Sequence, residues 1–191
     1  MTYVHLKPSD YATSTWSGGT TTQIGIAPAG AVYADRDFLW RISSATVDLE
    51  VSDFTALPDY DRLIATLEGS IDVTHNGGDV IPLAPYHVHS FDGGWETRSV
   101  GRCTDFNLMT RKGACRGELD AVLVTEEAPA QVTLQNVTDA IVYCAEGTVQ
   151  VLLCGETIAL QAAESLKLQN AEAVTLTVTG TGKLMIAKTY Y

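Results

Sequence analysis

Short apolar runs, each followed by turn residues, recur along the whole chain. The runs are rich in β-branched residues, as in Val47–Val51, Ile141–Tyr143 and Val174–Val178, and a turn signal interrupts them about every 8–15 residues. No segment sustains the apolar stripe of a helix, whose period is about 3.6 residues, and candidate helices are brief, for example around Gln161–Leu166. The pattern predicts an all-β fold.

An internal repeat refines this prediction. Residues 67–83 align with residues 145–160 after a one-residue gap, so that Gly69 falls on Gly147 and Gly78 on Gly155. Each copy reads as a strand, a Glu-Gly turn, an alternating strand, a glycine turn and a further strand, which is the hairpin that closes the small jelly roll of a cupin. Two copies predict a double cupin, with two jelly-roll-like β-barrels packed together in one chain.

The two predicted barrels differ in chemistry. We expect the first over residues 1–116 and the second over residues 117–191, with the C-terminal strand of the second free to return to the first. Every His, Arg, Trp and Phe lies at or before Arg116, and none follows Leu119. Ligand recognition is therefore expected in the first barrel. The second is expected to serve as a scaffold or as an association surface, for instance in a homodimer.

Composition narrows the classes of partner. The 191 residues are 46% hydrophobic, which is ample for a packed core, and 23 acidic against 12 basic residues give a net charge of -11. An acidic chain is a poor partner for nucleic acid or an anionic membrane, and no stretch approaches the roughly 20 apolar residues of a membrane helix. Because the N-terminus lacks an apolar signal region, we expect a soluble, cytoplasmic protein. The four cysteines show no C-x-x-C spacing and are predicted to be free thiols.

Polar residues alternate with apolar ones in two segments, residues 38–45 and 104–109. Successive side chains of a strand point to opposite faces, so Arg41 and Ser43 share one face of the first segment. Asp105 and Asn107 share one face of the second in the same way. If both polar faces point into one barrel, they line a cavity with a cation, a carboxylate and two neutral hydrogen-bonding groups.

Arginine is the residue type that suits a carboxylate ligand, because its planar guanidinium forms bidentate pairs. Asp105 is then placed to receive an amine or to orient Arg41, and the alternative is a structural Arg-Asp pair. Arg62, expected just before a strand, is a second candidate for binding an anion. Its alternative is an ordinary solvated loop charge.

The histidines define a competing hypothesis. His87 and His89 are predicted to share one strand face, and His75 lies on a neighbouring hairpin, so these three with Asp92 or Asp105 are candidate metal ligands. A metal-dependent cupin enzyme would use such a set, whereas the alternative is surface or wall histidines. No nucleophile stands in a motif context, so no catalytic residue is assigned and no cofactor is expected.

Several motifs resemble one known family over essentially the whole chain, the HutD/Ves family. They are Trp16–Thr20 with Thr22–Ile24, Trp40–Ser43, Phe54–Pro58 leading into Asp61-Arg62, Leu67–Gly69, Phe91–Gly93 and Thr104–Arg111. The resemblance implies a bicupin fold and, in part of the family, a role in sensing or limiting an intermediate of histidine utilisation. It also makes Trp16 a candidate ligand-binding residue. The chain departs from the family pattern at Ser17, Thr20 and Gln23, where the family carries Asn, Gly and a nearby Glu.

We therefore expect a bicupin that binds a small carboxylate or amino-acid-derived metabolite, with a metal-dependent enzyme as the alternative. The expected ligand-binding residues are Arg41, Ser43, Arg62, Asp105, Asn107 and Trp16.

Overall fold

The computed structural model describes residues 1–191, which form two compact units. One unit comprises residues 11–117, and the other comprises residues 1–10 together with residues 118–191. The N-terminus thus differs from the expected division, because β1 (Thr2–Leu6) pairs antiparallel with β15 (Ser165–Tyr190). The strands that pair with β15 are β1, β12 (Arg116–Val124) and β13 (Ala130–Leu153), so the C-terminal strand does not return to the sheets of the other unit.

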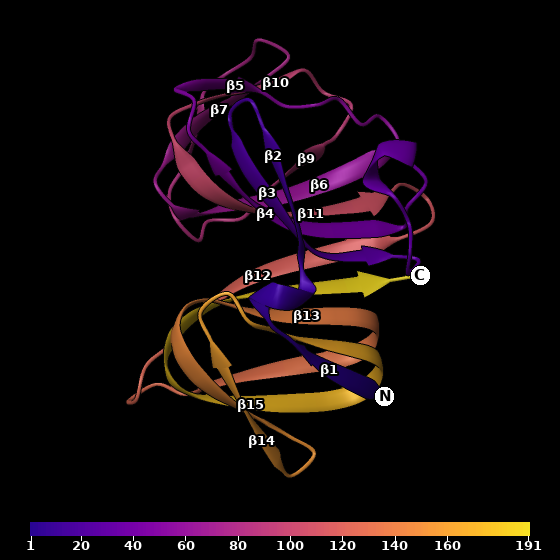
Figure 1. Ribbon diagram of the computed structural model, residues 1–191, viewed down its shortest axis with the longest axis vertical. Helices are drawn as coiled ribbons and strands as arrows, with labels where there is room; N and C mark the ends of the chain where they lie inside the picture. Colours follow the sequence, from indigo (N-terminus) through magenta and orange to yellow (C-terminus); the bar gives the residue numbers. More distant parts are fainter. The chain divides into compact units, whose positions relative to one another are not determined.

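The unit of residues 11–117 contains two antiparallel sheets (Figure 1). The larger sheet has the strand order β2 (Ala12–Trp16), β3 (Gly19–Ala27), β4 (Trp40–Val47), β11 (Cys103–Arg111), β6 (Tyr60–Glu68) and β9 (His89–Asp92). The smaller sheet has the order β5 (Val51–Asp53), β10 (Thr97–Val100), β7 (Ile71–His75) and β8 (Ile81–Leu83). An aliphatic and aromatic cluster from β6, β7, β8 and β9 forms part of its core.

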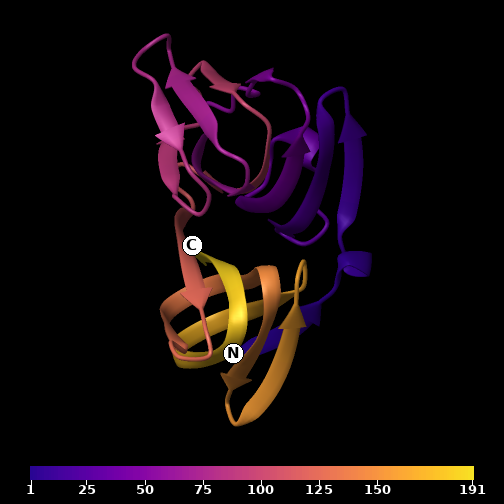
Figure 2. The same cartoon turned by 90° about the vertical axis from the view of Figure 1, so that its left-hand side faces the viewer.

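The other unit is built mainly from two long strands, β13 with 24 residues and β15 with 26. Residues 139–143 of β13 pair with both residues 165–169 and residues 185–189 of β15, so β15 flanks this stretch on both edges. The orange and yellow strands consequently curve around a common core in Figure 2. The buried residues of that core are aliphatic apart from Cys144, and Tyr3 and Tyr190 pack against it.

Helical structure is confined to two 3-10 turns, η1 (Pro8–Asp10) and η2 (Tyr33–Asp35). The brief helix considered near Gln161–Leu166 is wrong. β14 (Glu156–Gln161) ends there, and a turn with Ala163 at φ 66° leads into β15. None of the helices has the length and apolar character needed to cross a membrane.

The Glu-Gly turn of the repeat requires glycine for the same backbone reason in both units. Gly69 and Gly147 adopt φ +73° and +83°, and a Cβ on either would overlap a backbone carbonyl oxygen, of Arg102 or Thr181. Only glycine meets both demands. The predicted alignment of Gly78 with Gly155 needs a correction. Gly155 is a left-handed turn residue with φ +84°, and its equivalent is Gly77 with φ +67°, one position before Gly78.

We expect Gly147→Ala to lower the free energy of unfolding by about 3 kcal/mol or more, because strain at positive φ adds to the overlap with Thr181. Gly155→Ala is the matched control: its φ is also positive, but a Cβ there meets nothing within 4 Å, so we expect a loss of only about 1 kcal/mol. Urea unfolding of both variants measures the difference. Equal losses would show that the close backbone approach is unimportant.

Candidate ligand-binding site

Three adjacent strands, β4, β11 and β6, place polar side chains in rows across the larger sheet. In one row Arg41 and Arg62 flank Met109, and two residues along β11 the next row contains Ser43 and Asn107. A third row contains Ala45, Asp105 and Thr66. Because side chains two residues apart share a face, these rows face the same side of the sheet. The apolar residues that alternate with these polar ones along the chain are fully buried, namely Phe38, Trp40, Ile42, Phe106 and Leu108.

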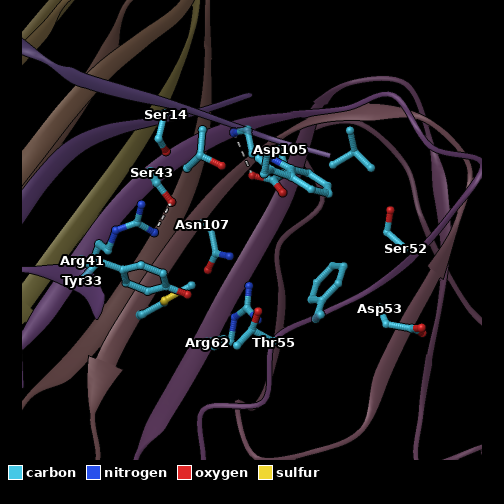
Figure 3. A pocket seen from close by; sticks show the side chains of 16 residues that line it. Ser14, Tyr33, Arg41, Ser43, Ser52, Asp53, Thr55, Arg62, Asp105 and Asn107 are labelled. Carbon is cyan, nitrogen blue, oxygen red and sulfur yellow. Dashed lines mark hydrogen bonds between the residues drawn. The ribbon is translucent and has the colours of Figure 1, made fainter. Parts of the chain in front are cut away.

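The polar face borders a cavity of about 380 Å³, within the range of about 300–1,000 Å³ that is typical of small-molecule sites. All six residues expected to bind a ligand line it, and Figure 3 shows Asn107 between Arg41 and Arg62. Five of the six are buried, whereas Trp16 is 39% exposed and therefore lies where the cavity meets solvent. The structure thus brings together Arg41, Ser43, Arg62, Asp105, Asn107 and Trp16.

Arg41 is held in a fixed orientation by neighbouring strands. Its Nε donates to Oε1 of Gln23 at 2.9 Å, and its Nη1 donates to Oγ of Ser43 at 3.1 Å. The ring of Tyr33 lies against the guanidinium, with 4.2 Å between Cζ and the ring centroid. Burial lowers the pKa of Arg41, while Tyr33 and Asp105 oppose that shift. Gln23, where the family pattern differs, therefore positions this arginine.

Arg62 is the most enclosed cation of the site. It lies within β6, not in a loop, and packs between two aromatic rings. Its Cζ is 5.0 Å from the ring centroid of Phe54 and 5.2 Å from that of Phe91. Its Nε is buried and has no hydrogen-bond partner. Burial lowers the pKa of Arg62 to about 10, opposed by the charge of Asp105, so the guanidinium stays protonated at neutral pH. A buried donor without a partner costs free energy, which a ligand acceptor would recover.

Asp105 and Asn107 complete the polar face. Oδ1 of Asp105 accepts from the backbone N–H of Ala45 at 3.2 Å. Burial raises the pKa of Asp105 to about 6, against the opposing charges of Arg62 and Arg41. The Oδ1 atom of Asn107 is buried without a partner. Two side chains that line the cavity, Arg62 and Asn107, therefore each have a buried polar atom without a partner, a donor on Arg62 and an acceptor on Asn107.

Several lining residues were not predicted from the sequence. Tyr33 comes from the turn η2, where no strand periodicity indicates a direction. Phe54 belongs to a family motif, but its contact with Arg62 depends on how the strands assemble. Ser52 lines the cavity with its hydroxyl buried and unpaired. The hydroxyl of Thr66, which pairs with Asp105 in the sheet, is also buried and unpaired, but Thr66 does not line the cavity.

The candidate metal ligands do not gather in one place. His87 precedes β9, is exposed, and has its Nδ1 3.2 Å from the carbonyl oxygen of Pro85. The prediction that His87 and His89 share a strand face is wrong, because β9 begins only at His89 and His87 lies before it. His75 and His89 do meet, at 2.8 Å between Nε2 atoms. No group of three or more His, Cys, Asp or Glu side chains is placed to hold a metal ion.

Comparison with known proteins agrees with the resemblance seen in the motifs. The family model described as HutD matches residues 8–186. The chain belongs to the HutD family. The predicted HutD/Ves membership is therefore confirmed. Cupin-type structures are among the further matches, so the expectation of an all-β double cupin is confirmed as well.

Individual similar proteins show the extent of the similarity. A conserved protein of unknown function from Pseudomonas aeruginosa PAO1 shares the fold with a TM-score of 0.87 and 21% identity, covering 100% of both chains. HutD from Pseudomonas fluorescens SBW25 does so with a TM-score of 0.79 and 22% identity, covering 99% of this chain and 98% of that one. Protein Ves from Cronobacter sakazakii is 36% identical over 90 residues, which span 44% of this chain and 49% of Ves.

Proposed function

We propose that the cavity of residues 11–117 binds a small carboxylate, of the kind derived from an amino acid, without turning it over. The observation that carries this proposal is the buried, unpaired Nε of Arg62. A guanidinium pairs best with a planar carboxylate, and Arg41 supplies a second cation on the same face.

The remaining polar groups restrict the ligand further. The unpaired Oδ1 of Asn107 requires a donor, so the ligand carries an N–H or O–H group in addition to its carboxylate. The two arginines outnumber the one buried carboxyl, that of Asp105, whose raised pKa makes it partly protonated near pH 6. The other lining carboxyl, that of Asp53, is paired with Arg98. The cavity is therefore cationic inside an acidic chain, and an anion gains from entering it.

Family membership supports a regulatory role in histidine utilisation, in which the bound acid is an intermediate of that pathway. Such a role needs a binding site and no catalytic group. HutD from Pseudomonas fluorescens was studied in a formate condition, and formate, the smallest carboxylate, therefore belongs among the probes.

A thermal-shift screen tests the proposal. The probes are formate, urocanate, formiminoglutamate, formylglutamate and related dicarboxylates. An acid at about 100 times its dissociation constant adds about 2.7 kcal/mol, which is about 5–10 °C in melting temperature for a chain of this size. We expect at least one acid to produce this shift and Arg41→Ala to remove most of it.

The matched control is Arg102→Ala, because the Arg102 side chain is 69% exposed and lies outside the cavity. It should leave the shift unchanged. No shift from any acid, or equal shifts in the Arg41→Ala and wild-type proteins, would overturn carboxylate binding at this site.

A further inference from the structure

Two imidazoles meet head-on outside the cavity lining. His75 ends β7 and His89 begins β9, and their Nε2 atoms are 2.8 Å apart. The ring centroids are 5.1 Å apart with an interplanar angle of 20°. For a given distance between the two Nε2 atoms, the ring centroids are farthest apart when both atoms lie on the line that joins the centroids. The observed separation of 5.1 Å is close to that maximum. Both Nε2 atoms therefore point at each other along the line that joins the rings.

Hydrogen bonds on the far side of His75 define its tautomer. The hydroxyl of Thr97 donates to the carbonyl oxygen of Trp95 at 3.3 Å, which leaves its Oγ1 lone pair to accept from Nδ1 of His75 at 2.9 Å. With its proton on Nδ1, His75 has a free lone pair on Nε2. His89 then donates its Nε2 proton to that lone pair. One nitrogen of the pair is thus already in the form that binds a metal ion, with its ring oriented by Thr97.

The surroundings of the pair are aromatic. The centroids of Phe91 and Trp95 lie 4.8 Å and 5.2 Å from that of His75. No further His, Cys, Asp or Glu joins the pair to make a three-ligand group. Burial disfavours the charged form of both rings and lowers the pKa of His75 and of His89.

We propose that His75 and His89 form a linear, two-coordinate site for a monovalent soft metal ion, Cu⁺. Zinc sites have three or four protein ligands and hard cations take oxygen ligands, so neither class fits two imidazoles among aromatic rings. Imidazole suits copper, and a monovalent d¹⁰ ion favours two ligands in line.

The geometry accommodates the ion with little rearrangement. With metal–nitrogen bonds of about 2.0 Å, the rings must separate by about 1.2 Å along the line that they already share. Neither ring has to turn. The proton on Nε2 of His89 moves to Nδ1 of the same ring, so both imidazoles remain neutral, no net proton is released and the metal keeps its oxidation state.

Silver nitrate is the probe, because Ag⁺ is a redox-stable ion of the same class. Cys154 is an exposed thiol that would also bind Ag⁺, so the titration uses the Cys154→Ser chain. Nitrogen NMR of the imidazoles reports the site. We expect the Nε2 signals of His75 and His89 to shift together and to saturate at one ion per chain, while the signals of His87 stay in place.

Two variants and a second metal complete the test. His75→Gln and His89→Gln should each weaken Ag⁺ binding by more than about tenfold, since even an outer-shell change commonly costs that much, whereas His87→Gln should not. Zn²⁺ should shift the same signals only at concentrations more than about tenfold higher. The proposal fails if Ag⁺ leaves the signals of His75 and His89 in place, or if Zn²⁺ moves them as readily. Because the NMR experiment retains both histidines, its outcome does not depend on either variant folding.

Discussion

Replacing Arg62 by methionine should weaken binding of the acid that gives the largest thermal shift by at least about 30-fold. Losing one partner of a buried, hydrogen-bonded charge pair costs about 2 kcal/mol or more, which corresponds to that factor. Methionine fills a similar volume between Phe54 and Phe91, so the fold should persist. Titration calorimetry of the wild-type and Arg62→Met proteins measures the change in dissociation constant.

Two further variants test whether the loss of binding is specific to the guanidinium of Arg62. Arg62→Lys retains a positive charge but loses the planar fork, and it should bind the acid more weakly than the wild type. Arg102→Met removes an exposed arginine outside the cavity and should bind like the wild type. Undiminished binding by Arg62→Met would mean that the acid does not contact this guanidinium.

Asp105→Asn should stabilise the protein at pH 8 relative to the wild type, by up to about 3 kcal/mol. Burial raises the pKa of Asp105 from 3.8 to about 6, so between these values the folded state holds a proton that the unfolded state has lost. The contribution of Asp105 to the free energy of unfolding therefore falls by about 1.4 kcal/mol per pH unit as pH rises through this window. Above about pH 6 the contribution of Asp105 to the free energy of unfolding has fallen by its full amount. The neutral amide of the Asp105→Asn variant does not titrate and therefore avoids this loss.

Urea unfolding of the wild-type and Asp105→Asn proteins at pH 4 and pH 8 measures this effect. The difference between the two proteins isolates Asp105 from other groups that titrate in the same range. We expect the advantage of Asp105→Asn to grow by about 3 kcal/mol from pH 4 to pH 8. A constant difference would show that the carboxyl titrates near its ordinary pKa.

Strand periodicity predicted the polar face of the cavity because it depends only on local geometry. Arg41 with Ser43, and Asp105 with Asn107, lie two residues apart in regular strands, so their shared face follows from the sequence. The same rule failed for His87 and His89, since β9 begins only at His89 and His87 lies before it. Alternation carries no information outside a strand.

The features that the sequence did not predict depend on pairing between strands that are far apart in the sequence. The N-terminal strand joins β15 across more than 150 residues of sequence, and neither strand identifies the other by pattern. Arg62 faces the cavity because β6 lies beside β11. Phe54 reaches Arg62 from the other sheet, where its backbone N–H donates to Thr97 of β10. The unpaired atoms of Arg62 and Asn107, on which the proposed function rests, become visible only once the strands are assembled.

A crystal structure of the wild-type protein with the strongest acid from the thermal-shift screen tests the central claim most directly. We expect a carboxylate oxygen of the ligand within about 3 Å of Nε of Arg62, and a donor group of the ligand on Oδ1 of Asn107. An acid bound outside the cavity, or one that leaves both of these atoms paired only with water, would contradict the assignment of this site.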